Sequence, residues 1–148
     1  MKIGVISDTH GLLRPEVTKV LSGCDMILHA GNIDYPVILD RLEAIAPVIA
    51  VCGNCDWDFS EDLPLVKQTR IEGRLVCMAH RKYDLPGDTS LFDLVIFGHS
   101  HKYEERRSGK TVFLNPGRCG PRRFGQDVTM ALVDLTDDGI YVKRVDIC

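Results

Sequence analysis

The sequence predicts a mixed α/β domain in which two β-sheets pack together and helices cover them. In the first third of the chain, short apolar runs alternate with amphipathic segments, which is typical of parallel β-α-β units. In the remainder, apolar runs are joined by short turns containing glycine, which is typical of antiparallel hairpins. A length of 148 residues fits a single domain over residues 1–148, with enough chain to bury a core.

The first third of the chain predicts three strands and two helices. The strands are the apolar runs Lys2–Ser7, Met26–Ala30 and Val48–Cys52. Proline is common in the first turn of a helix, so Pro15 and Pro36 each mark a helix start. Gly23 is a stop signal for the first helix, and the second carries an apolar stripe.

Seven further strands are predicted in the rest of the chain. They are Leu65–Ile71, Arg74–Ala79, Leu94–Phe97, Tyr103–Arg107, Thr111–Leu114, Val128–Asp134 and Ile140–Val145. Three of the connections between them read as hairpin turns. The segment 81–93 contains Pro and Gly and lacks an apolar stripe of helical period. We therefore expect the crossover there to be shortened or to have no helix.

Composition and charge exclude several functional classes. The net charge of −3 argues against general nucleic-acid binding. No run is long enough to cross a membrane, and the apolar run before Asp8 is too short for a signal peptide. The six cysteines have no framework spacing, so we expect free thiols in a cytoplasmic protein. The sequence leaves a homo-oligomer open.

Side chains that can bind metal ions follow five of the predicted strands. They are Asp8, His10, Asn32, Asn54, His80, His99 and His101. Loops at the carboxyl ends of parallel strands meet at one edge of a sheet, so these side chains are expected to converge. Imidazole and carboxylate ligands together suit Mn, Fe, Zn or Ni. His29 lies inside an apolar strand and is interpreted as a core histidine.

These residues carry a resemblance to a known family. The segments DTH at 8–10, GN at 31–32, GNCD at 53–56, GHSH at 98–101 and NPG at 115–117, with His80, resemble the calcineurin-like metallophosphoesterase superfamily. The chain is most similar to its small bacterial and archaeal phosphodiesterases. The resemblance implies a four-layer αββα sandwich of two packed sheets. It also implies hydrolysis of a phosphodiester substrate by a metal-bound hydroxide at a dinuclear site.

The resemblance further implies a role for each ligand. One ion would be held by Asp8, His10 and His101, and the other by Asn54, His80 and His99. Position 32 would bridge the two ions. The expected ions are divalent, with manganese first and nickel, iron or zinc as alternatives. Asn54 and His99 are the predicted catalytic residues, since Asn54 can also donate a hydrogen bond to a phosphoryl oxygen.

The chain departs from the family pattern in the shortened crossover at 81–93 and at three further places. Asn32 stands where the family has a bridging aspartate, so the affinity for two ions should fall. Cys55 stands where related enzymes often have a histidine as general acid, and Asp56 is a candidate substitute. Arg81 follows His80, where the family branch has Gly-His. A retromer subunit with this fold works as a binding scaffold. A weak or inactive relative acting as a protein-binding scaffold is therefore the alternative function.

Three further interpretations concern residues near the ligands. Arg118 follows the turn at 115–117 and, with Arg122, is predicted to bind substrate phosphate. Asp34 could itself reach the metals and supply the charge that Asn32 lacks. The pair at 52 and 55 also fits a redox dithiol pattern. However, the Gly-Asn between those cysteines belongs to the metal motif, so a redox role is disfavoured.

Overall fold

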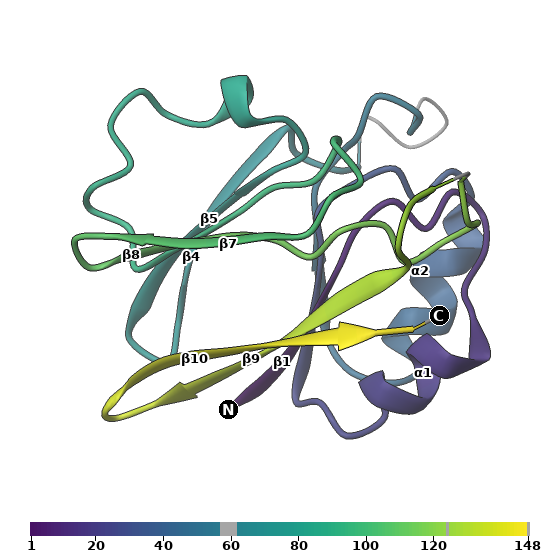
Figure 1. The fold of residues 1–148 in the computed structure, drawn as a ribbon, viewed down its shortest axis with the longest axis horizontal. Helices are drawn as coiled ribbons and strands as arrows, with labels where there is room; N and C mark the ends of the chain where they lie inside the picture. Colours follow the sequence, from purple (N-terminus) through teal and green to yellow (C-terminus); the bar gives the residue numbers. More distant parts are fainter. Residues whose placement is uncertain (57–61, 124, 148) are drawn as a thin grey trace.

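Two five-stranded sheets form the framework of the protein (Figure 1). The computed structural model describes residues 1–56, 62–123 and 125–147. The first sheet has the order β10-β9-β1-β2-β3, from β1 (Lys2–Ile6), β2 (Met26–His29), β3 (Val48–Ala50), β9 (Thr129–Thr136) and β10 (Gly139–Asp146). The second has the order β4-β5-β6-β8-β7, from β4 (Val66–Ile71), β5 (Arg74–Ala79), β6 (Leu94–Ile96), β7 (Glu104–Ser108) and β8 (Thr111–Asn115). Every strand begins and ends within two residues of its predicted bounds.

The two sheets contain matching blocks of parallel strands. In the first sheet β1, β2 and β3 are parallel, while β9 and β10 run antiparallel beside them. In the second sheet β5, β6 and β8 are parallel, flanked by the antiparallel strands β4 and β7. The carboxyl ends of three strands in each sheet therefore lie at a common edge, where ligand sites form.

The main core lies between the two sheets. Ile3 and Val5 of β1 face it, together with Met78 of β5 and Ile96 of β6, and all four are buried. Ile6, the next residue of β1, faces the opposite side and belongs to the core under the helices. This alternation follows from the two-residue period of a strand. A strand buried on both faces explains the continuous apolar run of β1.

Helices α1 (Pro15–Leu21) and α2 (Pro36–Glu43) cover the outer face of the first sheet (Figure 1). Each has proline at its first turn, as predicted. Leu21 of α1 packs so close to β1 that a Cβ on Gly4 would lie 2.2 Å from its Cδ2 atom. A side chain at position 4 would therefore require the Leu21 side chain to move.

The outer face of the second sheet has a thin cover. In the described part of segment 81–93 the only helical turn is the 3₁₀ turn Lys82–Asp84, as the lack of an apolar stripe predicted. A small cluster of Cys77, Phe92 and Val95 packs beneath this loop. The predicted α/β class with two packed sheets is confirmed, and the fourth layer is this loop. No helix among the described residues is long and apolar enough to cross a membrane.

Candidate functional site

The predicted ligand residues meet where the parallel strands of both sheets end. Asp8, after β1, lies 3.8 Å from His80, after β5 in the other sheet, measured from carboxylate Oδ1 to imidazole Nε2. The loops are joined by backbone hydrogen bonds: the amide of Asp8 donates to Gly31, and the amide of Gly98 donates to His80. The convergence expected from the strand ends is therefore present.

The backbone of these loops is unusual. Among the described residues other than glycine, seven have positive φ, and six of these are in or beside the site. The six are Asp8, His10, Asn32, Asp34, His99 and His101. A non-glycine residue in this conformation costs on the order of 1 kcal/mol or more, and such residues cluster at functional sites. The surrounding packing therefore holds these loops in a geometry that the residues themselves disfavour.

The carboxylate of Asp8 is the centre of the site and is fully buried. Its Oδ1 atom lies 3.2 Å from His101 Nε2 and 3.5 Å from His10 Nε2. Its Oδ2 atom accepts a 2.7 Å hydrogen bond from the Ser7 hydroxyl. Burial by itself would raise the pKa of Asp8, but the neighbouring imidazoles of His10 and His101 outweigh it and hold the pKa well below its ordinary value. Asp8 is therefore a carboxylate at neutral pH.

In two of the histidines, a contact to Nδ1 fixes which ring nitrogen carries the proton. His80 Nδ1 lies 2.7 Å from the carbonyl of Ala30, so it must carry the proton and donate it. His10 Nδ1 lies 3.3 Å from the carboxylate of Asp34 and donates in the same way. When either ring is neutral its Nε2 therefore has a free lone pair, and both Nε2 atoms are buried without a hydrogen-bond partner. This arrangement is typical of histidines that ligate metals.

The third imidazole is held differently. Arg118 donates from Nη1 to His101 Nδ1 at 3.1 Å, and it also donates from Nε to the carbonyl of Pro121. Because a guanidinium only donates, Nδ1 accepts, and the His101 proton sits on Nε2, which faces Asp8. His101 can ligate through Nε2 only if this proton moves and Arg118 gives up its contact. Arg118 is buried against a ligand, while Arg122 is exposed. Their predicted contact with substrate stays a prediction.

The Asn32 amide occupies the space between the two groups of ligands. Its Nδ2 donates to Asp8 Oδ1 at 3.2 Å and to Asn54 Oδ1 at 3.0 Å. Its Oδ1 accepts from the backbone amide of Cys55 at 2.9 Å. These partners fix the orientation, because turning the amide over would face its oxygen to two acceptors and its nitrogen to a donor. Position 32 thus presents N–H groups where a bridging ligand would present lone pairs.

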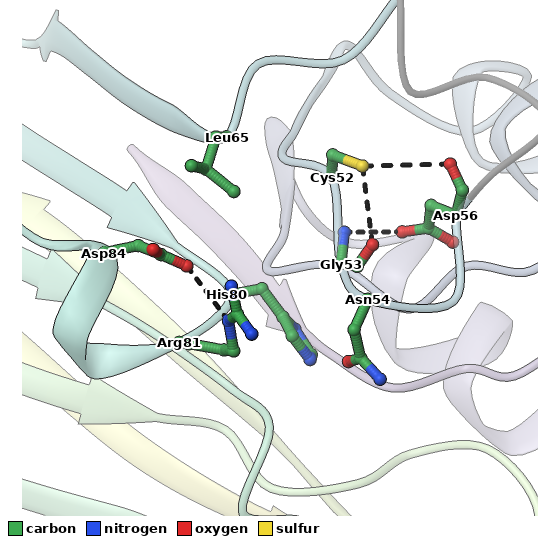
Figure 2. A pocket seen from close by; sticks show the side chains of 8 residues that line it. All are labelled: Cys52, Gly53, Asn54, Asp56, Leu65, His80, Arg81 and Asp84. Atoms are coloured by element: carbon green, nitrogen blue, oxygen red, sulfur yellow. Dashed lines mark hydrogen bonds and ion pairs between the residues drawn. The ribbon is translucent and has the colours of Figure 1, made fainter.

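The predicted catalytic residues lie at the mouth of the site. Asn54 and His99 are both exposed. The His99 ring packs edge-to-face against the buried His80 ring, with 5.3 Å between their centroids. Figure 2 shows Asn54 and His80 side by side in the lining of a cavity of about 300 Å³ that is also lined by Arg81 and Leu65. The exposed side chains of Asn54 and His99 can therefore be reached by a substrate.

Asp56 has a role that the sequence did not reveal. Its buried carboxylate accepts four backbone hydrogen bonds of 2.8–2.9 Å, from the amides of Asn32, Ile33, Asp34 and Gly53. Both oxygens are occupied by donors, and the side chain is 1% exposed. The suggestion that Asp56 substitutes as general acid is therefore wrong. It joins the loops after β2 and β3.

The remaining interpretations can be placed as well. The five described cysteines are free, and burial raises the pKa of the Cys52 and Cys55 thiols, which disfavours redox chemistry. His29 is a fully buried core histidine, as predicted: Nε2 lies 3.0 Å from the Thr9 hydroxyl, and Nδ1 accepts from the Gly31 amide. Asp34 contacts the outer nitrogen of His10.

Comparison with known proteins identifies the family. Residues 1–138 match the model of the calcineurin-like phosphoesterase superfamily domain. The chain belongs to this superfamily. A probable metallophosphoesterase of Methanothermobacter thermautotrophicus is 35% identical over 99% of this chain and 87% of its own length. The phosphodiesterase MJ0936 of Methanocaldococcus jannaschii is 26% identical over 80% and 84%. A solved archaeal phosphodiesterase has the same fold, with a TM-score of 0.83 at 23% identity and 99% coverage of both chains.

The calcineurin-like phosphoesterase superfamily implies bound metal ions, and part of this site fits one. Ligand atoms of Asp8, His10 and His101 all lie within 4.8 Å of one another. The unpartnered Nε2 of neutral His10 supplies a lone pair, and the ionised carboxylate of Asp8 supplies a negative charge. A second ion fits less well, because Asn32 donates to Asn54 and offers no carboxylate. Asp8, His10 and His101 therefore form a half-site that fits one ion, once the His101 proton has moved, and the residues around Asn54 form a second half-site that fits an ion less well.

Proposed function

We propose that this chain is a metal-dependent phosphodiesterase whose principal ion is held by Asp8, His10 and His101. The observation that supports this most directly is the cluster of ligand atoms of Asp8, His10 and His101 within 4.8 Å of one another, in which the buried His10 Nε2 has no hydrogen-bond partner. Leaving imidazole nitrogens buried and unsatisfied is costly in a metal-free fold. A bound divalent ion, with manganese expected first, would satisfy them. Membership of the superfamily supports the same function.

The residues around the half-site suggest how a phosphodiester is handled. When bound, a divalent ion lowers the pKa of a water and polarises a phosphoryl oxygen. Asn54 is exposed at the mouth, and its Oδ1 is occupied by Asn32, so its Nδ2 is the group that can turn to a phosphoryl oxygen. His99 can donate to a second oxygen. Two donors on the phosphoryl group stabilise the charge that develops there.

The second part of the proposal concerns the other half-site. Asn54, His80 and His99 would hold a second ion, which would make the site dinuclear. The Asn32 amide opposes that state, because its N–H groups face Asp8 and Asn54. We propose that the second ion binds more weakly than the first. Cys55 is a protonated thiol and a poor general acid, so esters with good leaving groups should react best.

The direct test is hydrolysis of bis-p-nitrophenyl phosphate across a metal panel that includes Mn and Ni. We expect activity that is lost on chelation and in His99→Ala, with little activity on p-nitrophenyl phosphate. Metal analysis of the same preparations should find at least one equivalent per chain. Activity absent with every metal, or unaffected by His99→Ala, would overturn the proposal.

The alternative function is that of a protein-binding scaffold. Partner binding would then survive loss of the metal site, because the binding surface lies elsewhere. A co-purification comparison between wild type and the double variant His80→Ala, His101→Ala separates the two functions. A stable partner retained by the double variant, together with no metal uptake by wild type, would favour the scaffold.

A further inference from the structure

Two cavities beside the site share Arg81, the residue that follows His80. The first, of about 300 Å³, lies on the Asn54 side, and Figure 2 shows Leu65 and Cys52 on its wall. The second, of about 460 Å³, lies on the His99 side. Arg81 lines both. The phosphoryl position proposed between Asn54 and His99 therefore has one cavity on each side of it.

Two flanking cavities match the shape of a phosphodiester. A diester has two organic arms on one phosphorus atom, whereas a monoester has one. The Arg81 guanidinium is anchored between the cavities, because its Nε donates to Asp84 at 3.1 Å. An anchored arginine at this point favours an anionic group. The cavities can then take one arm each.

The second cavity has a distinct chemistry. Three aromatic residues line it: Tyr83, Phe97 and Tyr103. Lys82 and Lys102 add positive charge, and Glu104 lies 3.1 Å from the Lys82 ammonium and offsets part of it. Its volume lies within the range of about 300–1,000 Å³ typical of small-molecule sites.

Tyr83 is the most exposed of these aromatic side chains. The Arg81 guanidinium carbon lies 4.4 Å from the centre of its ring and covers one face. The residue is 73% exposed, so the other face is open to solvent. A flat ring that is held on one side and open on the other is suited to stack with a second planar group. Segment 81–93 lacks the crossover helix that would cover this region, so the ring can be reached.

We propose that the second cavity is a subsite for the nucleoside arm of a phosphodiester, with the base stacked on Tyr83. This inference rests on the proposed phosphodiesterase function and names its substrate class. A nucleobase supplies the planar group, and the lysines complement the anionic character of a nucleotide. The smaller cavity beside Leu65, which has no lysine among its described lining residues, takes the other arm.

The test compares two diesters with the same leaving group. They are p-nitrophenyl methyl phosphate and thymidine 5′-(p-nitrophenyl phosphate), which differ only in their second arm. In wild type we expect the nucleoside diester to have the higher kcat/KM. Tyr83→Ala should reduce this preference about tenfold, as loss of one stacked base does, and Tyr83→Phe should keep it. Tyr141→Ala is the matched control, because Tyr141 is also exposed, at 56%, but lies on β10 of the other sheet.

A binding measurement separates this proposal from the proposed function. Calorimetric titration with a non-hydrolysable thymidine phosphonate diester should give a Kd about tenfold weaker for Tyr83→Ala than for wild type or Tyr141→Ala. That result supports the subsite even if no diester is hydrolysed. Equal kcat/KM for the two diesters in wild type, or equal effects of Tyr83→Ala and Tyr141→Ala, would overturn the subsite while leaving the phosphodiesterase function standing.

Discussion

Asn32→Asp tests the central feature of the site. The substitution replaces Nδ2, which donates to Asp8 Oδ1 at 3.2 Å, with a carboxylate oxygen. Two unit charges at that distance repel by about 5 kcal/mol at an effective dielectric constant of 20. Uptake of a shared proton lowers this penalty in the metal-free protein. We therefore expect the metal-free variant to unfold at a lower temperature than wild type.

In the presence of metal, the added carboxylate of Asn32→Asp should be favourable instead of unfavourable. A divalent ion held by Asp8 and the new carboxylate would attract both groups, and these two attractions would outweigh the repulsion between them. If only a quarter of the 5 kcal/mol is recovered, affinity for manganese rises about tenfold. The rise should be largest for the second equivalent, because Asn54 Oδ1 is also released from the Asn32 amide. Phosphodiesterase activity should rise with it.

The assay is calorimetric titration with manganese, together with thermal unfolding in chelator and in saturating metal. Asn32→Ala is the matched control, since it removes the donor without adding charge. For Asn32→Asp we expect the unfolding temperature in chelator to fall and the affinity for manganese to rise. If neither quantity moves, position 32 does not lie between the ligands and the reasoning fails.

Three further predictions follow from individual contacts. Asp34→Ala should weaken manganese binding about tenfold without abolishing it, because Asp34 orients His10 from behind; complete loss in titration would mean that Asp34 is itself a ligand. Asp56→Ala should lower the free energy of unfolding by about 3–5 kcal/mol in denaturant titration, because buried backbone amides lose their acceptor; a change below about 1 kcal/mol would contradict this. Burial lowers the pKa of His29 from 6.5 to about 4. Below pH 6.5 the unfolded chain therefore binds a proton that the folded chain does not, and stability should fall by about 3 kcal/mol as the pH drops from 6.5 to 4. His29→Gln should reduce this fall, and an equal fall in both proteins would argue against it.

The framework of the fold could be predicted because local signals agree with it. Proline marked both helix starts, and apolar runs marked strands to within two residues. The lack of an apolar stripe in segment 81–93 indicated the absence of a crossover helix. The convergence of the ligands followed from a rule about parallel strands. Each of these inferences needs only neighbours along the chain or a general rule of topology.

The details of the site could not be predicted, because they depend on partners far apart in the chain. The orientation of the Asn32 amide is set by Asp8 and Asn54, both more than 20 residues away. The role of Asp56 depends on four backbone amides from two loops. A motif names the residue at a position, but its tautomer and its donor direction come from tertiary contacts.

The amide at position 32 has a physical rationale in the metal-free protein. Asp8 and Asp56 already place two buried carboxylates beside this position, one hydrogen-bonded to the Asn32 side chain and the other to its backbone amide. A third carboxylate would leave three acidic groups in one buried cluster, which is strongly unfavourable without metal. Asn32 instead donates to Asp8 and Asn54 and stabilises the loops before an ion arrives. The same hydrogen bonds must be broken to complete the second half-site. Stability without metal and affinity for a second ion are therefore opposed through one side chain.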